Sequence, residues 1–133
     1  MKDMRWNNKI VLVTGGNGFL GRQVVKQLEK RNPQKIICPS SKDYDLREKE
    51  NCKKIVKDVD YIFHLAGKGG GIGIQKENSA EIFYDNIMMS TNLIHESKEA
   101  NVEKFIAIGT VCSYPKFAKI PFTEELIWDG YPE

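Results

Sequence analysis

A glycine-rich turn between an apolar run and an amphipathic run constrains the fold of this chain more than any other feature. Residues 10–13 are all apolar, and three spaced glycines follow at Gly15, Gly18 and Gly21. An amphipathic segment, 19–30, begins within the turn. This order predicts a strand, a tight turn and a helix. Gly15 lets the chain turn sharply off the strand, and Gly21 lets the helix pack closely against the sheet.

The start of the predicted helix is suited to a phosphate group. The first backbone N–H groups of a helix have no partner within it, and the helix dipole places its positive end there. At Gly18 no Cβ prevents these N–H groups from approaching a ligand. The turn is therefore predicted to bind the pyrophosphate of a dinucleotide. A turn that binds nothing is the alternative, and the strand before it and the helix after it argue against that reading.

Short apolar runs alternate with longer amphipathic runs along the rest of the chain. Strands are expected at 10–14, 35–38, 61–66 and 104–109, and helices at 19–31, 48–59 and 79–100. A glycine-rich loop, 67–73, comes before the last of these helices. This alternation predicts an α/β fold, a doubly wound sheet of parallel strands. Such sheets bind ligands at the carboxyl ends of their strands.

Size, charge and cysteine content limit the possible classes of protein. A chain of 133 residues has room for one domain, and its net charge of +2 comes from interspersed acidic and basic residues. Nothing in this pattern indicates a nucleic-acid or membrane partner, and no signal-peptide core or spanning segment is present. The three cysteines, Cys38, Cys52 and Cys112, have no metal-type spacing. We therefore expect reduced thiols, no metal site and a cytoplasmic protein.

The end of the second predicted strand bears on the choice of dinucleotide. An acidic residue there binds the free 2′-hydroxyl of NAD, whereas small polar and basic residues accommodate the 2′-phosphate of NADP. The sequence at this point is Cys38-Pro-Ser-Ser-Lys42, and the first acid is Asp43. The pattern favours NADP, with Ser40 as a binding residue. NAD stays possible, because Lys42 is equally consistent with a solvated loop charge.

Several motifs together resemble the extended short-chain dehydrogenase/reductase family, also described as NAD-dependent epimerases and dehydratases. They are Thr14-Gly-Gly-Asn-Gly-Phe-Leu-Gly21, Asp43-Tyr-Asp-Leu-Arg47, Tyr61-Ile-Phe-His-Leu-Ala-Gly67 and Tyr84-Asp-Asn86. Within this family, Gly69-Gly-Gly-Ile-Gly73 and Gly109-Thr-Val-Cys-Ser-Tyr-Pro115 resemble the GDP-L-fucose synthases. The resemblance covers essentially the whole chain. It implies a Rossmann-like fold and an NADP-dependent enzyme that epimerises and reduces a GDP-4-keto-6-deoxy-mannose-type sugar.

The resemblance also implies a role for each matching residue. The glycine turn would cradle the pyrophosphate, Asp45 and Leu46 would meet the adenine ring, and the segment 65–67 would lie along the nicotinamide half. Thr110 occupies the place of a catalytic Ser/Thr, and Cys112 that of an acid/base used in epimerisation. The expected cofactor residues are Gly15, Asn17, Gly18, Phe19, Leu20, Gly21, Ser40, Asp45, Leu46, Leu65, Ala66, Gly67 and Gly109.

The residues alone leave other interpretations open. Thr110 is equally well explained as a β-branched residue that closes a strand. A single cysteine such as Cys112 is more often a small buried hydrophobic residue than a catalyst. His64 lies within a strand, where a hydrogen-bonded core histidine is expected. Lys68 either steers a phosphate or solvates its glycine loop, and the second is expected.

The family's Tyr-x-x-x-Lys pair does not occur in the chain after Thr110. We therefore expect residues 1–133 to be the dinucleotide-binding part of a longer enzyme, inactive alone and without the substrate domain. Another NAD(P)-dependent nucleotide-sugar epimerase or dehydratase, or a non-catalytic dinucleotide-binding module, is the alternative. The resemblance also implies a homodimer through the helix 79–100. The strand 104–109 is expected to leave an apolar edge that favours association.

Overall fold

A parallel four-stranded sheet lies at the centre of the computed structural model, which describes residues 6–131. The strands are β1 (Ile10–Thr14), β2 (Lys35–Ile37), β3 (Tyr61–His64) and β4 (Lys104–Ala107). Their order in the sheet is β2-β1-β3-β4, and all three neighbouring pairs are parallel. The chain therefore builds outward from β1 first on one side and then on the other, as in a doubly wound fold.

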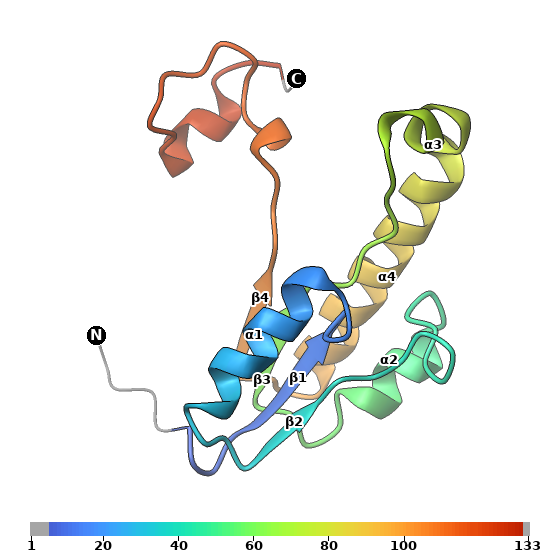
Figure 1. Ribbon diagram of the computed structural model, residues 1–133, viewed down its shortest axis with the longest axis vertical. Coiled ribbons are helices and arrows are strands. Elements are labelled where there is room, and N and C mark those ends of the chain that lie inside the picture. The colour runs from blue at the N-terminus through green and yellow to red at the C-terminus, as the bar shows by residue number, and fades with distance from the viewer. Residues whose placement is uncertain (1–5, 132–133) are drawn as a thin grey trace.

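Helices cover both faces of this sheet (Figure 1). They are α1 (Phe19–Glu29), α2 (Lys49–Ile55), α3 (Ile72–Glu77) and α4 (Ser79–Glu99). Two 3₁₀ turns, Val111–Ser113 and Glu124–Trp128, follow β4 in a segment that projects beyond the sheet (Figure 1). None of the helices in residues 6–131 combines the length and apolar character needed to span a bilayer.

The core consists of two layers, because successive strand residues point to opposite faces. On one face, Leu12 and Ile62 pack with α2 and with Leu93 of α4, and all three side chains are completely buried. On the other face, Val11 and Val13 pack against Leu28 of α1. The nearly unbroken apolar run of β1 is thus explained by burial on both sides.

The doubly wound parallel sheet predicted from the sequence is confirmed, but several element ends are wrong. The helix expected at 48–59 ends at Ile55, because the chain turns through a left-handed conformation at Asp58 (φ 60°). The first helix ends at Glu29, before a second left-handed residue, Asn32 (φ 50°). The strands expected to reach 66 and 109 end at His64 and Ala107, where the aligned pairing of β1, β3 and β4 stops. Part of the expected loop 67–73 is helical, since α3 begins at Ile72.

The strand order reverses at β1, which has β2 on one side and β3 on the other. The loops after β1 and β3 therefore separate toward opposite faces and leave a crevice at the carboxyl end of the sheet. This crevice lies beside the glycine turn that follows β1. The fold therefore places the predicted binding turn where a doubly wound sheet binds its ligands.

Candidate functional site

A cavity of about 620 Å³ lies at the carboxyl ends of the strands. It is lined by the loops that follow β1, β2 and β3 and by one side of α4. Its lining consists of Thr14, Gly15, Asn17, Gly18, Pro39, Ser40, Ser41, Tyr44, Asp45, Leu46, Arg47, Leu65, Ala66, Gly67, Lys68, Asp85 and Met89. The volume lies within the range typical of small-molecule and cofactor sites.

The glycine turn is packed so tightly that side chains are excluded at two of its positions. Gly15 has a φ of +69°, and a Cβ there would lie 2.7 Å from the backbone nitrogen of Ala66. A Cβ at Gly21 would lie 2.0 Å from the carbonyl oxygen of Gly15. The start of α1 is therefore in direct contact with the turn, which is the role that the sequence predicts for Gly21.

The amino-terminal end of α1 leaves backbone donors open toward an anion. Gly18 is the N-cap in an extended conformation, and no side chain caps the helix. Arg22 N–H donates to the carbonyl of Gly18 (3.1 Å), so the preceding N–H groups of residues 19–21 lack a partner from the regular helical pattern. Together with the helix dipole, these donors favour a phosphate at this point. The residues present therefore fit the diphosphate of a dinucleotide.

A buried histidine connects the ends of β1, β3 and α4. His64 Nδ1 lies 2.7 Å from Thr14 Oγ1, and His64 Nε2 lies 3.2 Å from Ser90 Oγ. Thr14 Oγ1 also accepts a hydrogen bond from Ala66 N–H (3.4 Å). Burial lowers the pKa of His64. The expectation of a hydrogen-bonded core histidine is confirmed, and its partners fix the strand end beside the cavity.

The loop after β3 is bound to α4 through its backbone. Lys68 N–H donates to Asn86 Oδ1 (2.7 Å), and Asn86 Nδ2 donates back to the carbonyl of Lys68 (2.8 Å). One amide side chain thus satisfies both polar backbone groups of Lys68. This fixes the first part of a loop whose glycines would otherwise allow many conformations.

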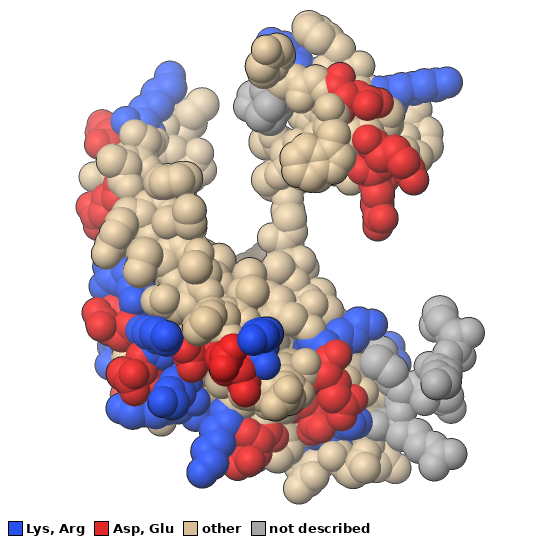
Figure 2. Space-filling model, turned by 180° about the vertical axis from the view of Figure 1, so that it is seen from behind, with Lys and Arg blue, Asp and Glu red and all other residues tan. Residues whose placement is uncertain are grey.

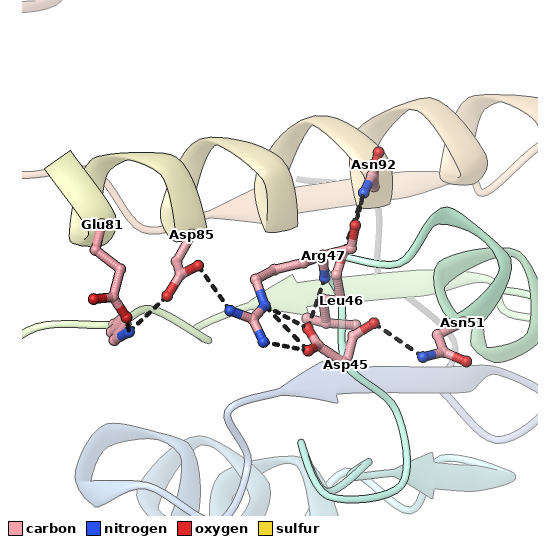
Figure 3. Close-up of polar contacts among 8 residues, drawn as sticks. Asp45, Leu46, Arg47, Asn51, Glu81, Asp85 and Asn92 are labelled. Carbon is pink, nitrogen blue, oxygen red and sulfur yellow. Dashed lines mark hydrogen bonds and ion pairs between the residues drawn. The ribbon is translucent and has the colours of Figure 1, made fainter.

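The loop after β2 is held by a second set of polar contacts (Figure 3). Arg47 Nε and Nη2 donate to the Asp45 carboxylate at 3.0 and 2.6 Å, and Asn92 of α4 donates to the Arg47 carbonyl (2.7 Å). The hydrogen bonds from Arg47 lower the pKa of Asp45. Leu46, between the two charged residues, is buried in the core. Asp45 and Leu46 both line the cavity, as the resemblance implies for an adenine contact.

A network of charged side chains joins these two loops, and the sequence does not predict it. Asp85 of α4 accepts from Arg47 Nη1 (2.9 Å) through one oxygen and from Lys68 Nζ (2.7 Å) through the other. Lys68 also pairs with Glu81 one turn earlier on α4. The expectation that Lys68 only solvates its loop is therefore wrong. The spacing of Glu81 and Asp85, four residues apart on a helix, was the one available sequence signal.

The structure brings most of the predicted cofactor residues together, but not all of them. Those that line the cavity are Gly15, Asn17, Gly18, Ser40, Asp45, Leu46, Leu65, Ala66 and Gly67. Phe19, Leu20 and Gly21 lie outside this lining. Phe19 and Leu20 are exposed at 86% and 47%, whereas Gly21 is buried against the turn. Gly109, which the resemblance also assigns to the cofactor, lies outside the cavity lining in the exposed segment after β4.

The two predicted catalytic residues lie in that same segment and also outside the cavity lining. Thr110 is the N-cap of the turn Val111–Ser113, and its Oγ1 accepts a hydrogen bond from Cys112 N–H (3.2 Å). Cys112 is an exposed free thiol, so the alternative of a buried hydrophobic residue is wrong. The catalytic roles of Thr110 and Cys112 stay predictions.

The family model described as the NAD dependent epimerase/dehydratase family matches residues 11–131. The chain belongs to this family. A relative from Yersinia pseudotuberculosis, GDP-L-colitose synthase, is 32% identical over 122 residues, which are 90% of this chain and 39% of the relative. GDP-L-fucose synthase from Escherichia coli (strain K12) is 28% identical over 122 residues, again 90% of this chain, and 38% of the relative.

Solved structures agree with the family assignment. A GDP-mannoheptose C4 reductase from Campylobacter jejuni with NADP bound superposes with a TM-score of 0.85 at 29% identity. The match covers 96% of this chain and 41% of the reductase. The chain therefore spans about two-fifths of the length of the relatives it matches.

Figure 2 shows the charges on one face of the molecule. Basic and acidic side chains are interspersed over its lower part and form no large area of a single sign (Figure 2). Among residues 6–131, no three His, Cys, Asp or Glu side chains are grouped so that they would hold a metal ion.

Proposed function

We propose that this chain is the NADP-binding part of an epimerase-reductase that acts on a GDP-sugar. The observation that carries the proposal is the uncapped start of α1, which opens beside the cavity where the strand order reverses. Backbone donors at such a place bind the diphosphate of a dinucleotide. The named activities of the relatives, which are GDP-sugar synthases and reductases, supply the substrate class.

NADP is proposed in preference to NAD. Ser40 and Ser41 follow β2 and line the cavity, and neither position is acidic. The carboxylate of Asp45 is held by Arg47 through several hydrogen bonds, so it is not free to bind a ribose hydroxyl. The related reductase from Campylobacter jejuni carries NADP. Small hydroxyl side chains at this point leave room for a 2′-phosphate.

The chemistry proposed for the whole enzyme divides between the bound cofactor and this chain. Bound NADPH supplies a hydride to a sugar carbonyl. Thr110 would hold the sugar oxygen, and Cys112 would exchange a proton on the carbon next to the carbonyl. Because Thr110 Oγ1 accepts from Cys112 N–H, the turn holds the Thr110 side chain against the backbone of Cys112. The chain by itself is proposed not to turn over, since its 133 residues contain no Tyr-x-x-x-Lys after Thr110.

A substitution at the N-cap of α1 tests the proposal. Asp is a favoured N-cap residue, and the φ and ψ of Gly18 (−78° and −179°) are open to any side chain. The added Cβ would lie 3.2 Å from the Gly15 carbonyl oxygen, so the turn must give by a few tenths of an ångström, and Gly18→Asp should still fold. Its carboxylate would occupy the open N–H groups and repel a phosphate. We expect NADPH affinity, measured by cofactor fluorescence, to fall at least about tenfold, the fold-change of 1.4 kcal/mol. NADH should bind the unmodified chain more weakly than NADPH.

The matched control is Gly71→Asp, which places the same residue at the N-cap of another helix, α3. Gly71 is also extended, has open space around its Cβ position and does not line the cavity. The Gly71→Asp variant should bind NADPH as the unmodified chain does. The proposal fails if the unmodified chain does not bind NADPH, or if Gly18→Asp binds it equally well.

Two other functions are separated by different measurements. Another nucleotide-sugar epimerase or dehydratase would not need a thiol at Cys112, so Cys112→Ser in a protein that also carries the substrate domain would keep its activity. A non-catalytic module would bind NADPH but need neither Thr110 nor Cys112. The presence of both residues in one turn favours the epimerase-reductase.

A homodimer through α4 is proposed as the assembly. Several large apolar side chains of this helix are exposed, namely Phe83, Tyr84, Ile87 and Ile94. Isolated apolar residues are common on protein surfaces, but several on one helix mark a contact surface. Sedimentation of the chain should show self-association at high concentration, and a monomer at every concentration would count against it.

A further inference from the structure

The carboxylate of Asp85 is the only group in the charged network that contacts both cofactor loops, within residues 6–131. Its side chain is 4% exposed, and each of its oxygens receives a donor from a different loop. Oδ1 accepts from Arg47 of the loop after β2, and Oδ2 accepts from Lys68 of the loop after β3. Residues of both loops line the cavity.

Both cations have a second partner that does not cross between the loops. Arg47 is also bound by Asp45, two residues away in its own loop. Lys68 is also bound by Glu81 of α4. Removal of Asp85 would therefore leave each cation with one carboxylate and would break only the link between the loops. We therefore expect the two loops to lose their fixed arrangement, while the charges of Arg47 and Lys68 stay paired with Asp45 and Glu81.

The neighbouring contacts explain why this link matters. Asn86 and Asn92, on the same helix, bind backbone groups of Lys68 and Arg47. The loop after β3 contains Gly67, Gly69, Gly70 and Gly71. Such a segment gains much conformational entropy when it is released. The helix thus holds both loops, and Asp85 fixes the distance between their charged side chains.

We propose that Asp85 is a positioning residue of the cofactor site, which sets the loops after β2 and β3 for the dinucleotide by binding Arg47 and Lys68 at once. The proposal rests on the proposed function, in that the occupant of the cavity is NADP(H). Asp85 acts through the two loops, and the open N–H groups of α1 hold the diphosphate. Hydrogen bonds from Lys68 and Arg47 lower the pKa of Asp85, which keeps it ionised near neutral pH.

For the loss of the Asp85 charge, Coulombic attraction alone predicts the opposite change in NADPH affinity to the one that loop positioning predicts. NADPH carries several negative charges, so a pocket that loses one carboxylate should bind it more tightly. If Asp85 positions the loops, the same change should weaken binding, because the cofactor must then order both loops on entry. The sign of the change in affinity therefore distinguishes the two effects.

The test is Asp85→Asn in the 133-residue chain, with NADPH titrated and backbone hydrogen exchange followed in segments 39–47 and 65–73. We expect NADPH to bind about tenfold more weakly, the fold-change of 1.4 kcal/mol. Exchange should be faster in both segments. The conservative variant Asp85→Glu keeps the charge and should recover part of the affinity. Equal or tighter binding by Asp85→Asn would overturn the proposal.

Glu96→Gln is the matched control. Glu96 is also a buried carboxylate of α4 with a cationic partner, Lys49 at 3.5 Å, but it does not line the cavity. Glu96→Gln should change neither the NADPH affinity nor the rate of hydrogen exchange in segments 39–47 and 65–73. A loss of NADPH affinity in this control as large as in Asp85→Asn would show that any buried charge on α4 matters, and would overturn a specific role for Asp85.

A second variant covers the case in which Asp85→Asn does not fold. Lys68→Met breaks the same link from a side chain that is 43% exposed, and it should accelerate exchange in 39–47, the loop that it does not belong to. No such change in 39–47 would overturn the proposal. If the unmodified chain binds no NADPH, the proposed function fails, and the exchange data alone still decide whether Asp85 couples the loops.

Discussion

Substitution of Gly21 by Ala tests whether the close contact between α1 and the glycine turn holds the site together. The added Cβ would lie 2.0 Å from the Gly15 carbonyl oxygen and 2.6 Å from Gly16 Cα. Real Cβ atoms essentially never come within 3.0 Å of such atoms. Both obstacles belong to the backbone and cannot rotate away. The helix must therefore move, by a distance on the order of 1 Å, to restore normal contacts.

The size of the effect follows from two opposing contributions. Overpacking of a tight contact costs about 1–3 kcal/mol, and the upper part of this range applies because backbone atoms are in the way. Replacement of Gly by Ala inside a helix returns about 1 kcal/mol. The free energy of unfolding should therefore fall by about 2 kcal/mol. For a domain of this size, such a change lowers Tm by about 8 °C.

Thermal unfolding and NADPH titration together provide the assay. Movement of α1 also carries its open N–H groups away from the cavity, so NADPH affinity should fall along with Tm. Gly73→Ala is the matched control, since Gly73 lies in the helix α3 with nothing within 4 Å of its Cβ position. This control should be unchanged or slightly more stable. The reasoning is refuted if Gly21→Ala melts and binds NADPH like the unmodified chain.

Three further outcomes are expected. Burial lowers the pKa of His64 below its ordinary 6.5, so the unfolded chain binds the proton more readily than the folded chain. The free energy of unfolding should therefore fall as the pH drops from 6.5 toward the lower pKa of the folded state. Urea unfolding of His64→Gln should lack this pH dependence. Leu93→Ala should lower the free energy of unfolding by about 2–5 kcal/mol in the same assay, because Leu93 is completely buried. Ile94 is 50% exposed, so Ile94→Ala should lower it by less than about 1 kcal/mol. Cys112 should react rapidly with a thiol reagent in the folded chain, whereas Cys52, whose pKa burial raises to about 11, should react only on unfolding; equal rates would contradict this.

The glycine turn could be predicted from the sequence because every signal for it is local. A buried strand, a turn that needs a positive φ at Gly15 and a helix start lie within twelve residues, 10–21. The parallel sheet follows from the alternation of such units, since parallel strands need helical crossovers. For the same reason the cavity could be placed at the carboxyl ends of the strands.

Features that depend on partners far apart in the chain were not accessible in this way. Arg47 and Asp85 are 38 positions apart, and nothing in the sequence around either residue indicates the other. The ends of β3 and β4 depend on where neighbouring strands stop, so strand propensity extended both strands too far. The helix α3 was not predicted, because it contains Gly73 and follows Gly69, Gly70 and Gly71, and glycines usually indicate a loop.

The sequence predicts α4 as a single amphipathic helix, and the structure shows that its polar loop contacts and its exposed apolar residues lie on different sides. At about 100° per residue, Asp85 and Asn92 lie within about 20° of each other around the helix. Both bind the loop after β2. Phe83, Ile87 and Ile94, all exposed, lie about 160–200° away from Asp85. A charged residue at Ile87 should therefore weaken self-association while leaving NADPH affinity intact, and Asp85→Asn should do the reverse. If the two properties changed together in both variants, a single structural defect would explain them better than two separate faces.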